Sequence, residues 1–161
     1  MSKMKRTALL GISLVGLHLS VAAAQTSVIS KATLDNIKPL LEKAGYIVVL
    51  DNTGKAPFFE VQNTDKELLF YLDFFNCTAA GCANALANIS YEAKEFDKAP
   101  DLSSINAWND QYTAQAYLDD EGNPHLVSSY LFTGGFTSAN FTAWIKAYVD
   151  EDNDFYDALN K

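Results

Sequence analysis

Two cysteines, Cys77 and Cys82, carry the most reactive side chains of the chain and stand in the sequence Cys-Thr-Ala-Ala-Gly-Cys. A redox centre would require a CxxC spacing and a neighbouring cation that lowers the pKa of one thiol, and neither is present. A metal centre would require two further thiolate or imidazole ligands. The pair therefore favours a disulfide that closes a short loop, provided that the protein is exported.

A single histidine, His125, lies beyond the first 24 residues and follows Pro124 at the start of a predicted strand. As a general base it would need a nucleophile and an orienting group that converge on it. Ser128 and Ser129 are too close along the same strand to provide them, and the sequence has no Gly-x-Ser-x-Gly motif. Paired carboxylates of the glycosidase type stay open as an alternative, because the chain has 20 acidic residues. We expect no catalytic residue and no enzyme activity.

The acidic segment Asp-Asp-Glu-Gly-Asn-Pro at residues 119–124 has some of the composition of a calcium loop. An EF-hand loop requires a glycine at its sixth position and a glutamate at its twelfth, whereas the sixth residue here is Pro124. The same composition is typical of a tight turn between two strands. We therefore predict a turn, and we expect neither a metal ion nor a cofactor.

The first 24 residues have the pattern of a secretory signal peptide. A basic start is followed by an apolar run at 8–21 and by three alanines that end at Ala24. The apolar run is shorter than the roughly 20 residues that a membrane-spanning helix needs. We expect cleavage after Ala24, a periplasmic or secreted protein without stable membrane insertion, and a single domain over residues 25–161.

The chain is acidic, with 12 Lys and Arg against 20 Asp and Glu. Three of the cations and none of the acids precede residue 25, so the net formal charge after cleavage would be −11, without any arginine. Nucleic acids and anionic membranes require Lys and Arg to neutralise their phosphates, which makes both of them poor partners. The acidity favours solubility or attraction to a basic partner.

The first folded element is predicted to be a helix that Thr33 or Asn36 caps and Gly45 ends. Residues 25–31 before it are expected to form a flexible leader. Pro39 lies inside this helix, and it neither donates a hydrogen bond nor leaves room for the preceding turn. We therefore expect a kink or a late start of the regular helix.

Four strands are predicted between this helix and the next, from their apolar and β-branched residues and from the turns between them. Their ranges are 46–50, 58–62, 68–75 and 85–93. Apolar residues on both faces of 68–75 favour a central strand that is covered on both sides or lies against a partner chain. Asp73, within this strand, is expected to face solvent or to bind a turn.

A capped helix is predicted to begin at Leu102, after cap candidates at Asp101 and the two following serines. Leu102, Ile105, Trp108 and Tyr112 recur at spacings of three or four residues, so they are expected to be buried together on one face.

Asn106 and Asn109, on the neighbouring face of this helix, offer amides that could bind an adjacent loop. From residue 114 the period changes to two, which indicates a strand, and the alternation resumes at 126–132 after the turn. These two strands should form a hairpin.

A glycine pair at 134–135 precedes the last helix, which Thr137 or Ser138 is predicted to cap. Its apolar stripe consists of Phe141, Trp144, Ile145, Tyr148, Val149, Phe155 and Leu159. A solvated face is expected from Asp150, Glu151, Asp152, Asp154 and Asp157. The element order α-β-β-β-β-α-β-β-α predicts an α+β fold: an antiparallel sheet of about five to six strands with three helices packed on it.

Several of these features resemble the YbjN family. The most specific is the helix Ser-Ile-Asn-Ala-Trp-Asn at 104–109, followed by the strand end Tyr-Leu-Asp at 117–119 and the turn Asp-Glu-Gly. Weaker features are Ala-Gly-Tyr at 44–46, the paired cysteines after the third strand, and the glycine pair before the last helix. The resemblance spans roughly residues 34–159. The residues that we assign to a structural family motif are Ile105, Asn106, Trp108, Asn109, Asp119 and Gly122.

The resemblance implies the fold of type III secretion chaperones and membership of a group labelled sensory transduction regulators, without established catalysis. The family usually has basic residues just after the Asn-Trp-Asn helix, where this chain has Thr113, Ala114 and Gln115. An anion-binding role at that place therefore does not carry over. Fold alone does not define function.

Aromatic side chains on strand faces that one layer of helices leaves uncovered predict an interaction surface. Its candidate residues are Phe58, Tyr71, Phe75 and Tyr117. We expect a non-catalytic module, regulatory or chaperone-like, that holds a protein or peptide segment against its sheet. The partner could be a second copy of the chain, which would make the protein a homodimer. The alternative is a small-ligand sensor with a pocket between sheet and helices, lined by Trp108, Trp144 and tyrosines.

Overall fold

The computed structural model describes residues 27–54 and 56–161, and the predicted signal peptide lies outside them. Its main element is a six-stranded antiparallel sheet with the strand order β2-β3-β4-β5-β7-β6. The strands are β2 (Ile47–Asp51), β3 (Phe58–Gln62), β4 (Leu68–Phe75), β5 (Asn84–Ser90), β6 (Gln115–Leu118) and β7 (Pro124–Leu131). The helices are α1 (Leu34–Lys43), α2 (Leu102–Asn109) and α3 (Ser138–Leu159), with a short 3-10 helix η1 (Ala93–Glu95) before α2. The predicted α+β class and the order of its main elements are confirmed.

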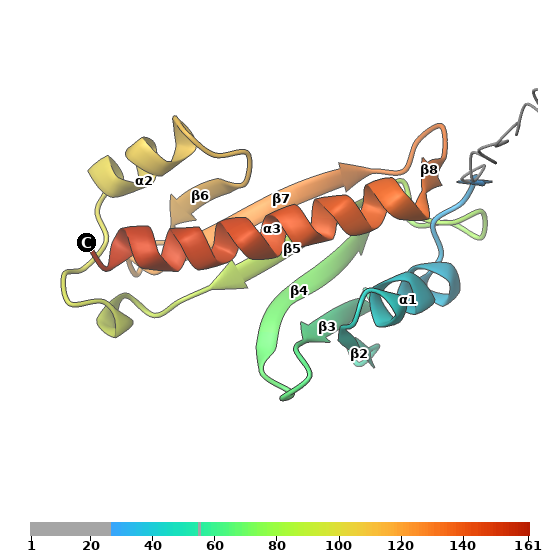
Figure 1. Ribbon diagram of the computed structural model, residues 1–161, viewed down its shortest axis with the longest axis horizontal. Helices are drawn as coiled ribbons and strands as arrows, with labels where there is room; N and C mark the ends of the chain where they lie inside the picture. Colours follow the sequence, from blue (N-terminus) through green and yellow to red (C-terminus); the bar gives the residue numbers. More distant parts are fainter. Residues whose placement is uncertain (1–26, 55) are drawn as a thin grey trace, which may run out of the picture.

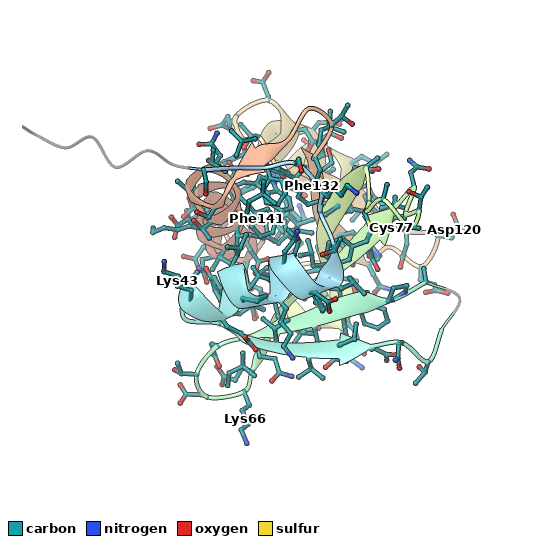
Figure 2. The ribbon with its side chains drawn as sticks, turned by 90° about the vertical axis from the view of Figure 1, so that its right-hand side faces the viewer. Lys43, Lys66, Cys77, Asp120, Phe132 and Phe141 are labelled. Carbon is teal, nitrogen blue, oxygen red and sulfur yellow. A yellow bond between two sulfur atoms is a disulfide. The ribbon has the colours of Figure 1, made fainter. Side chains whose placement is uncertain are left out.

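Helices α1 and α3 lie on the same face of the sheet, and α2 lies at one end of it beside β6 (Figure 1). The core fills the space between these helices and the sheet. Figure 2 shows Phe132 and Phe141 in this space, with ring centroids 5.9 Å apart. The largest fully buried side chains come from β3, β4, β7, α1 and α3: Phe59, Val61, Phe70, Leu72, Pro124, Leu126, Ile37, Leu41, Phe141, Ile145, Tyr148 and Phe155. The core is therefore one-sided with respect to the sheet.

Helix α1 is capped by Thr33, whose side chain accepts a hydrogen bond from the backbone N–H of Asn36. The backbone N–H of Thr33 in turn donates to the Oδ1 of Asn36, which completes a capping box. The helix continues through Pro39 to Lys43, so the expectation of a late start is wrong. Pro39 removes only one intrahelical hydrogen bond, and burial of the Ile37 and Leu41 side chains on either side of it offsets that loss.

The segment predicted to be a flexible leader contains a strand. β1 (Val28–Ile29) pairs antiparallel with β8 (Phe136–Thr137), which directly precedes α3. Gly135 permits this contact, because a Cβ atom there would lie 2.7 Å from the Val28 side chain, and its φ of +92° disfavours other residues. Periodicity could not predict the pairing, because a two-residue strand has no period to read.

The disulfide between Cys77 and Cys82 is present and closes the hairpin that joins β4 to β5. The backbone N–H of Cys82 donates to the carbonyl oxygen of Ala32 at 2.7 Å, which ties this hairpin to the segment before α1. Gly81 allows the approach, since a Cβ at this position would come within 2.7 Å of the same oxygen. The cysteine pair therefore holds a structural loop at the edge of the core.

β4 is an interior strand, as predicted, but helices cover only one of its faces. Phe70, Leu72 and Phe74 are buried under the helices, whereas Tyr71 and Phe75 alternate with them on the opposite side. Of the two predicted alternatives, cover on both sides is wrong for the described residues, and contact with a partner chain stays a prediction. The apolar second face instead belongs to a surface, which we call the open face: the side of the six-stranded sheet away from α1 and α3.

Candidate functional site: the open face and the rim of the sheet

The open face carries a broken belt of apolar side chains across the sheet. The register of the strands places the following large apolar residues on it: Val49, Phe58, Tyr71, Phe75, Leu86, Tyr117, Val127 and Leu131. Leu131 is 72% exposed, and Val49, Phe75 and Tyr117 are each more than 40% exposed. An apolar belt of this kind is typical of a surface that binds another molecule.

Three of the four predicted surface residues lie together. Phe58 and Tyr71 form an edge-to-face pair with ring centroids 5.7 Å apart, and Phe75 follows on the same strand as Tyr71. Tyr117 lies on β6, and β5 and β7 separate it from the other three. The prediction therefore identified one aromatic cluster and one separate residue of the same face.

Asp73 lies in the middle of this aromatic cluster, opposite Phe58 on β3 and Leu86 on β5. Its carboxylate accepts a hydrogen bond of 2.5 Å from the side-chain amide of Asn88. Burial raises the pKa of Asp73, and the bond from Asn88 opposes the rise. The predicted alternative of a solvent-facing side chain is confirmed, because Asp73 is partly exposed on the open face. It forms a polar point within an apolar surface.

His125 contacts Asp119, the residue that organises the turn between β6 and β7. Its Nε2 lies 3.3 Å from the Asp119 carboxylate, and its ring stacks on Tyr117 with centroids 4.7 Å apart. Asp119 also accepts the backbone N–H groups of Glu121 and Asn123, and these bonds, that of Asn123 foremost, lower the pKa of Asp119 to about 2. This arrangement stabilises a β-turn, as the sequence predicts.

The two serines near His125 point to different places. The hydroxyl of Ser128 accepts a hydrogen bond from the indole N–H of Trp144 at 2.9 Å, on the helix-covered side. Ser129 is exposed on the open face. These placements do not assemble a nucleophile, a base and an orienting group.

The motif residues of α2 bind the backbone that runs into β6. Asn109 uses its amide as a neighbouring strand would: its Nδ2 donates to the carbonyl oxygen of Ala116 at 3.0 Å, and its Oδ1 accepts the Ala116 N–H at 2.7 Å. The indole N–H of Trp108 donates to the carbonyl oxygen of Ala114 at 2.8 Å. The outer edge of β6 is thereby closed to further strands, which is one way in which proteins protect a sheet edge.

Two parts of the prediction for α2 need correction. The helix ends at Asn109, so Tyr112 follows its end and stacks on the Trp108 ring at 3.7 Å instead of continuing its apolar face. Leu102 is 68% exposed, while Ile105 and Trp108 are buried as predicted. The helix is too short for four residues at helical spacing to share one buried face.

The other motif positions divide by role. Asn106 is exposed, and its side chain makes no hydrogen bond within the part of the chain that the structure describes. Gly122 takes a φ of +83° in the turn after Asp119, a conformation that favours glycine. The motif is therefore structural at Trp108, Asn109, Asp119 and Gly122.

The acids of α3 were predicted to form a solvated face, and two of them do not. Glu151 accepts the backbone N–H and hydroxyl of Thr113 and the backbone N–H of Ala114. Asp152 accepts the hydroxyl of Tyr91 at 2.6 Å, and burial raises the pKa of Asp152 to about 6. Sequence reasoning missed both contacts because their partners lie 37 or more residues away along the chain.

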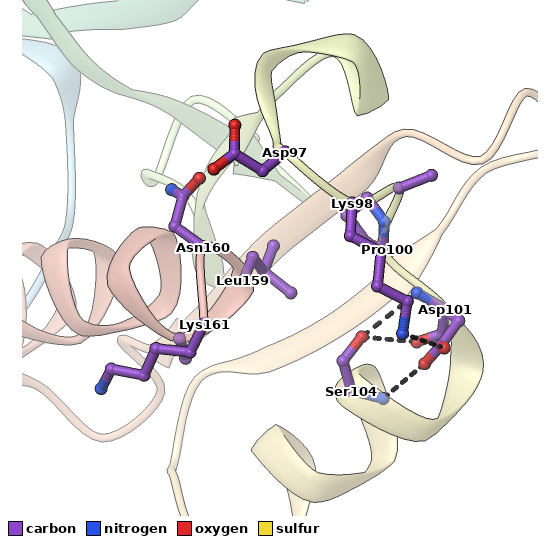
Figure 3. A pocket seen from close by; sticks show the side chains of 10 residues that line it. Asp97, Lys98, Pro100, Asp101, Ser104, Leu159, Asn160 and Lys161 are labelled. Carbon is purple, nitrogen blue, oxygen red and sulfur yellow. Dashed lines mark hydrogen bonds and ion pairs between the residues drawn. The ribbon is translucent and has the colours of Figure 1, made fainter.

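A pocket of about 220 Å³ lies between the end of α3 and the loop before α2 (Figure 3). Asp101 faces it, but its carboxylate already accepts the N–H groups of Ser103 and Ser104 as the cap of α2. Lys98 in turn lies 3.3 Å from the same carboxylate. These polar groups are committed to the start of the helix, so the pocket offers little for a ligand.

Among residues 27–54 and 56–161, no three His, Cys, Asp or Glu side chains gather closely enough to bind a metal ion. Nor does any helix there combine the length and the apolar character that crossing a membrane would require.

These features define an α+β protein whose antiparallel sheet is covered by helices on one face and open on the other. The family model YbjN, described as "Putative bacterial sensory transduction regulator", matches residues 33–161. The chain therefore belongs to the YbjN family, as the sequence resemblance suggested.

A solved structure supports the same fold. The crystal structure of YbjN from E. coli, described as a putative transcription regulator, aligns with a TM-score of 0.53 and 18% sequence identity. The alignment covers 80% of this chain and 91% of that chain. A search of curated proteins finds no match.

Proposed function

We propose that this protein is an exported, non-catalytic binding module that holds a segment of another polypeptide against the open face of its sheet. The observation that carries this proposal is the apolar belt on the open face, with Phe58, Tyr71 and Phe75 at its centre. In the part of the chain that the structure describes, helices α1 and α3 cover the opposite face. A partner that covers this surface would remove apolar area from water, which is favourable by a free energy of about 25 cal/mol per Å².

Asp73 gives the belt a polar anchor. Its carboxylate lies among aromatic side chains and is held by Asn88, so it is already oriented before a partner arrives. Aromatic residues around one oriented polar group are typical of the residues that contribute most to binding energy in protein interfaces. An Arg, a Lys or a backbone N–H of the partner would suit this carboxylate.

The alternative of a small-ligand pocket between sheet and helices has less support. Trp108 packs against Phe155 with ring centroids 5.0 Å apart, and Trp144 packs against Tyr130 at 5.1 Å. The two tryptophans belong to separate aromatic clusters, so they do not line one shared cavity.

Export is part of the proposal and rests on the predicted signal peptide and on the disulfide. Disulfides persist in oxidising compartments such as the periplasm and are rare in the cytosol. Protein recovered from the periplasm of a bacterial host is expected to begin at Gln25 and to resist alkylation at Cys77 and Cys82 unless it is first reduced. An uncleaved or cytoplasmic chain with free thiols would contradict export.

The binding surface can be tested with a photo-crosslinking amino acid placed at Phe75 in the native bacterium. We expect an adduct with one defined polypeptide, and the purified partner should bind the Phe75→Asp variant at least tenfold more weakly than the natural protein, because the change puts a charge into the apolar belt. An adduct of twice the monomer mass would identify a second copy of this chain as the partner.

The matched control is Leu102, which is 68% exposed on α2 and lies away from the open face. The crosslinker at Leu102 should give no such adduct, and Leu102→Asp should leave the affinity within twofold. Equal adducts from both positions, or none from Phe75, would contradict the proposal.

A further inference from the structure

On the side of the sheet where β6 lies, the α2–β6 unit leaves a stretch of the rim unprotected. β6 pairs with β7 from Leu118 opposite Pro124 to Gln115 opposite Val127, and there the pairing ends. β7 continues to Leu131 and remains paired with β5 on its other side. Figure 1 shows the second half of β7 extending beyond β6. We call residues 128–131 on this side the β7 edge.

The hydrogen bonds between Asn109 and Ala116 show to which side the backbone N–H and C=O groups of the β7 edge point. Because Asn109 binds both the N–H and the C=O of Ala116 on the outer side of β6, Ala116 does not pair with β7. In an antiparallel ladder the residues that face one neighbour alternate with those that face the other. Val127 therefore points its backbone groups at β6, and two and four residues later Ser129 and Leu131 point theirs to the same side.

No hydrogen bond joins the backbone of Ser129 or Leu131 to any group on that side among the described residues. Thr113, which would stand opposite Ser129 if β6 were longer, instead donates its N–H to Glu151. Unpaired strand edges of this kind are templates for another strand.

A pocket of about 380 Å³ lies directly beside this edge. Its apolar walls are Leu86, Val127 and Trp144, and Ser128 and Ser129 of β7 also line it. Trp144 is held in place there by the hydrogen bond from its indole N–H to Ser128. The pocket is completed by two polar residues, Thr113 just before β6 and Gln115 at its start. Backbone donors and acceptors next to a pocket with apolar walls match the pattern by which sheets bind extended peptides, with the backbone for affinity and the pocket for specificity.

The edge fits a short segment and excludes a second copy of this chain. Four residues of strand span about 13 Å. If two copies paired through this edge around a two-fold axis, β6 of the second copy would have to continue the line of β7 beyond Leu131. Phe132 and the turn to Phe136 already fill that line, since Phe132 donates its N–H to Ala83 and Gly135 bonds back to Phe132.

We propose that the β7 edge binds a short extended peptide, which adds to the sheet as a strand in line with β6 and places an apolar side chain in the pocket beside Trp144. This inference rests on the proposed function, because it assumes a polypeptide partner. It adds a second, backbone-directed contact at the rim of the open face.

The test uses peptides selected from a random phage-displayed library on the immobilised protein, made again by synthesis. Hydrogen exchange is expected to slow at the amides of Ser129 and Leu131 when a selected peptide is bound. Ser129→Pro should weaken binding at least tenfold, because proline removes the outward N–H while leaving the pairing of β7 with β5. Ser129→Ala, which keeps that N–H, should bind within twofold of the natural protein.

If Ser129→Pro does not fold, the peptide provides the second test. N-methylation of those peptide amides that face β7 should abolish binding, and N-methylation of the alternate amides should not. Absence of any selected peptide would overturn the inference, as would unprotected amides at Ser129 and Leu131 with a peptide bound. A peptide whose binding is lost in Phe75→Asp but kept in Ser129→Pro would retain the proposed function and reject strand addition.

Discussion

Replacing Trp108 with alanine is expected to lower the free energy of unfolding by about 4 kcal/mol, within the range measured for buried tryptophans. The side chain is only 3% exposed and touches three separate parts of the chain. Its ring stacks on Tyr112 and packs edge-on against Phe155 of α3, and its N–H binds Ala114 before β6. Alanine would leave a cavity at this junction and an unpaired buried carbonyl group.

Urea denaturation followed by circular dichroism measures this effect. Trp108→Phe keeps much of the ring contact and loses the hydrogen bond, so a smaller loss of about 1–2 kcal/mol is expected. Leu102→Ala on the same helix is the matched control, since an exposed side chain should change stability by no more than about 0.5 kcal/mol. A loss below about 1 kcal/mol in Trp108→Ala would show that α2 does not hold β6 in place.

Asp152→Asn is expected to remove a pH dependence from the stability of the protein. Burial raises the pKa of Asp152 to about 6 in the fold from an ordinary 3.8. Because the folded pKa lies above the unfolded one, the contribution of Asp152 is most favourable below the unfolded pKa and is lost as the pH rises through 6. A shift of about two units corresponds to about 3 kcal/mol.

The natural protein should therefore gain stability from this site between pH 7 and pH 4, and Asp152→Asn should not. At pH 7 the variant should be more stable by up to about 3 kcal/mol, since asparagine can still accept the Tyr91 hydroxyl without a buried charge. Glu95 and Tyr148 also face this site, and both remain in the variant.

Thermal unfolding from pH 4 to pH 7 measures the difference, with Asp154→Asn on the exposed side of α3 as the control for net charge. Parallel pH profiles for the natural protein and Asp152→Asn, equal to that of Asp154→Asn, would contradict a buried carboxylate at this position.

Local sequence signals predicted much of the fold. At each helix start one of the predicted cap candidates is used, because a cap is decided by residues three or four positions away. The caps are Thr33, Asp101 and Thr137. The strand at 68–75 has the predicted bounds, since a short run of mostly apolar residues between two turns is typical of a buried strand. The α+β class followed from the order of these elements.

The parts that sequence reasoning missed depend on distant residues. Nothing near Glu151 or Asp152 in the chain indicates that Thr113 and Tyr91 will bind them, so both acids were assigned to solvent. The exposure of the open face also depends on residues that are distant in the sequence. Apolar residues on both sides of β4 were consistent with two covering layers, and only the placement of α1 and α3 shows that one layer exists.

The contacts of the Asn-Trp-Asn helix were also predicted only in part. The sequence suggested that Asn106 and Asn109 could each bind a loop, and the structure assigns that contact to Asn109 alone. Which asparagine faces β6 depends on how the helix is rotated against the strand, and two residues three apart on a helix cannot decide this.

The pairing of Val28 with Thr137 has a consequence for the order in which the molecule assembles. During synthesis the N-terminal strand leaves the ribosome long before its partner, and a contact between such distant residues must wait for the chain to close on itself. The main sheet, α1 and α2 can form without it. The N-terminal strand β1, which is synthesised first, is therefore expected to pair last. Because this pairing has only two residue pairs, β1 is also expected to be the first element to unfold.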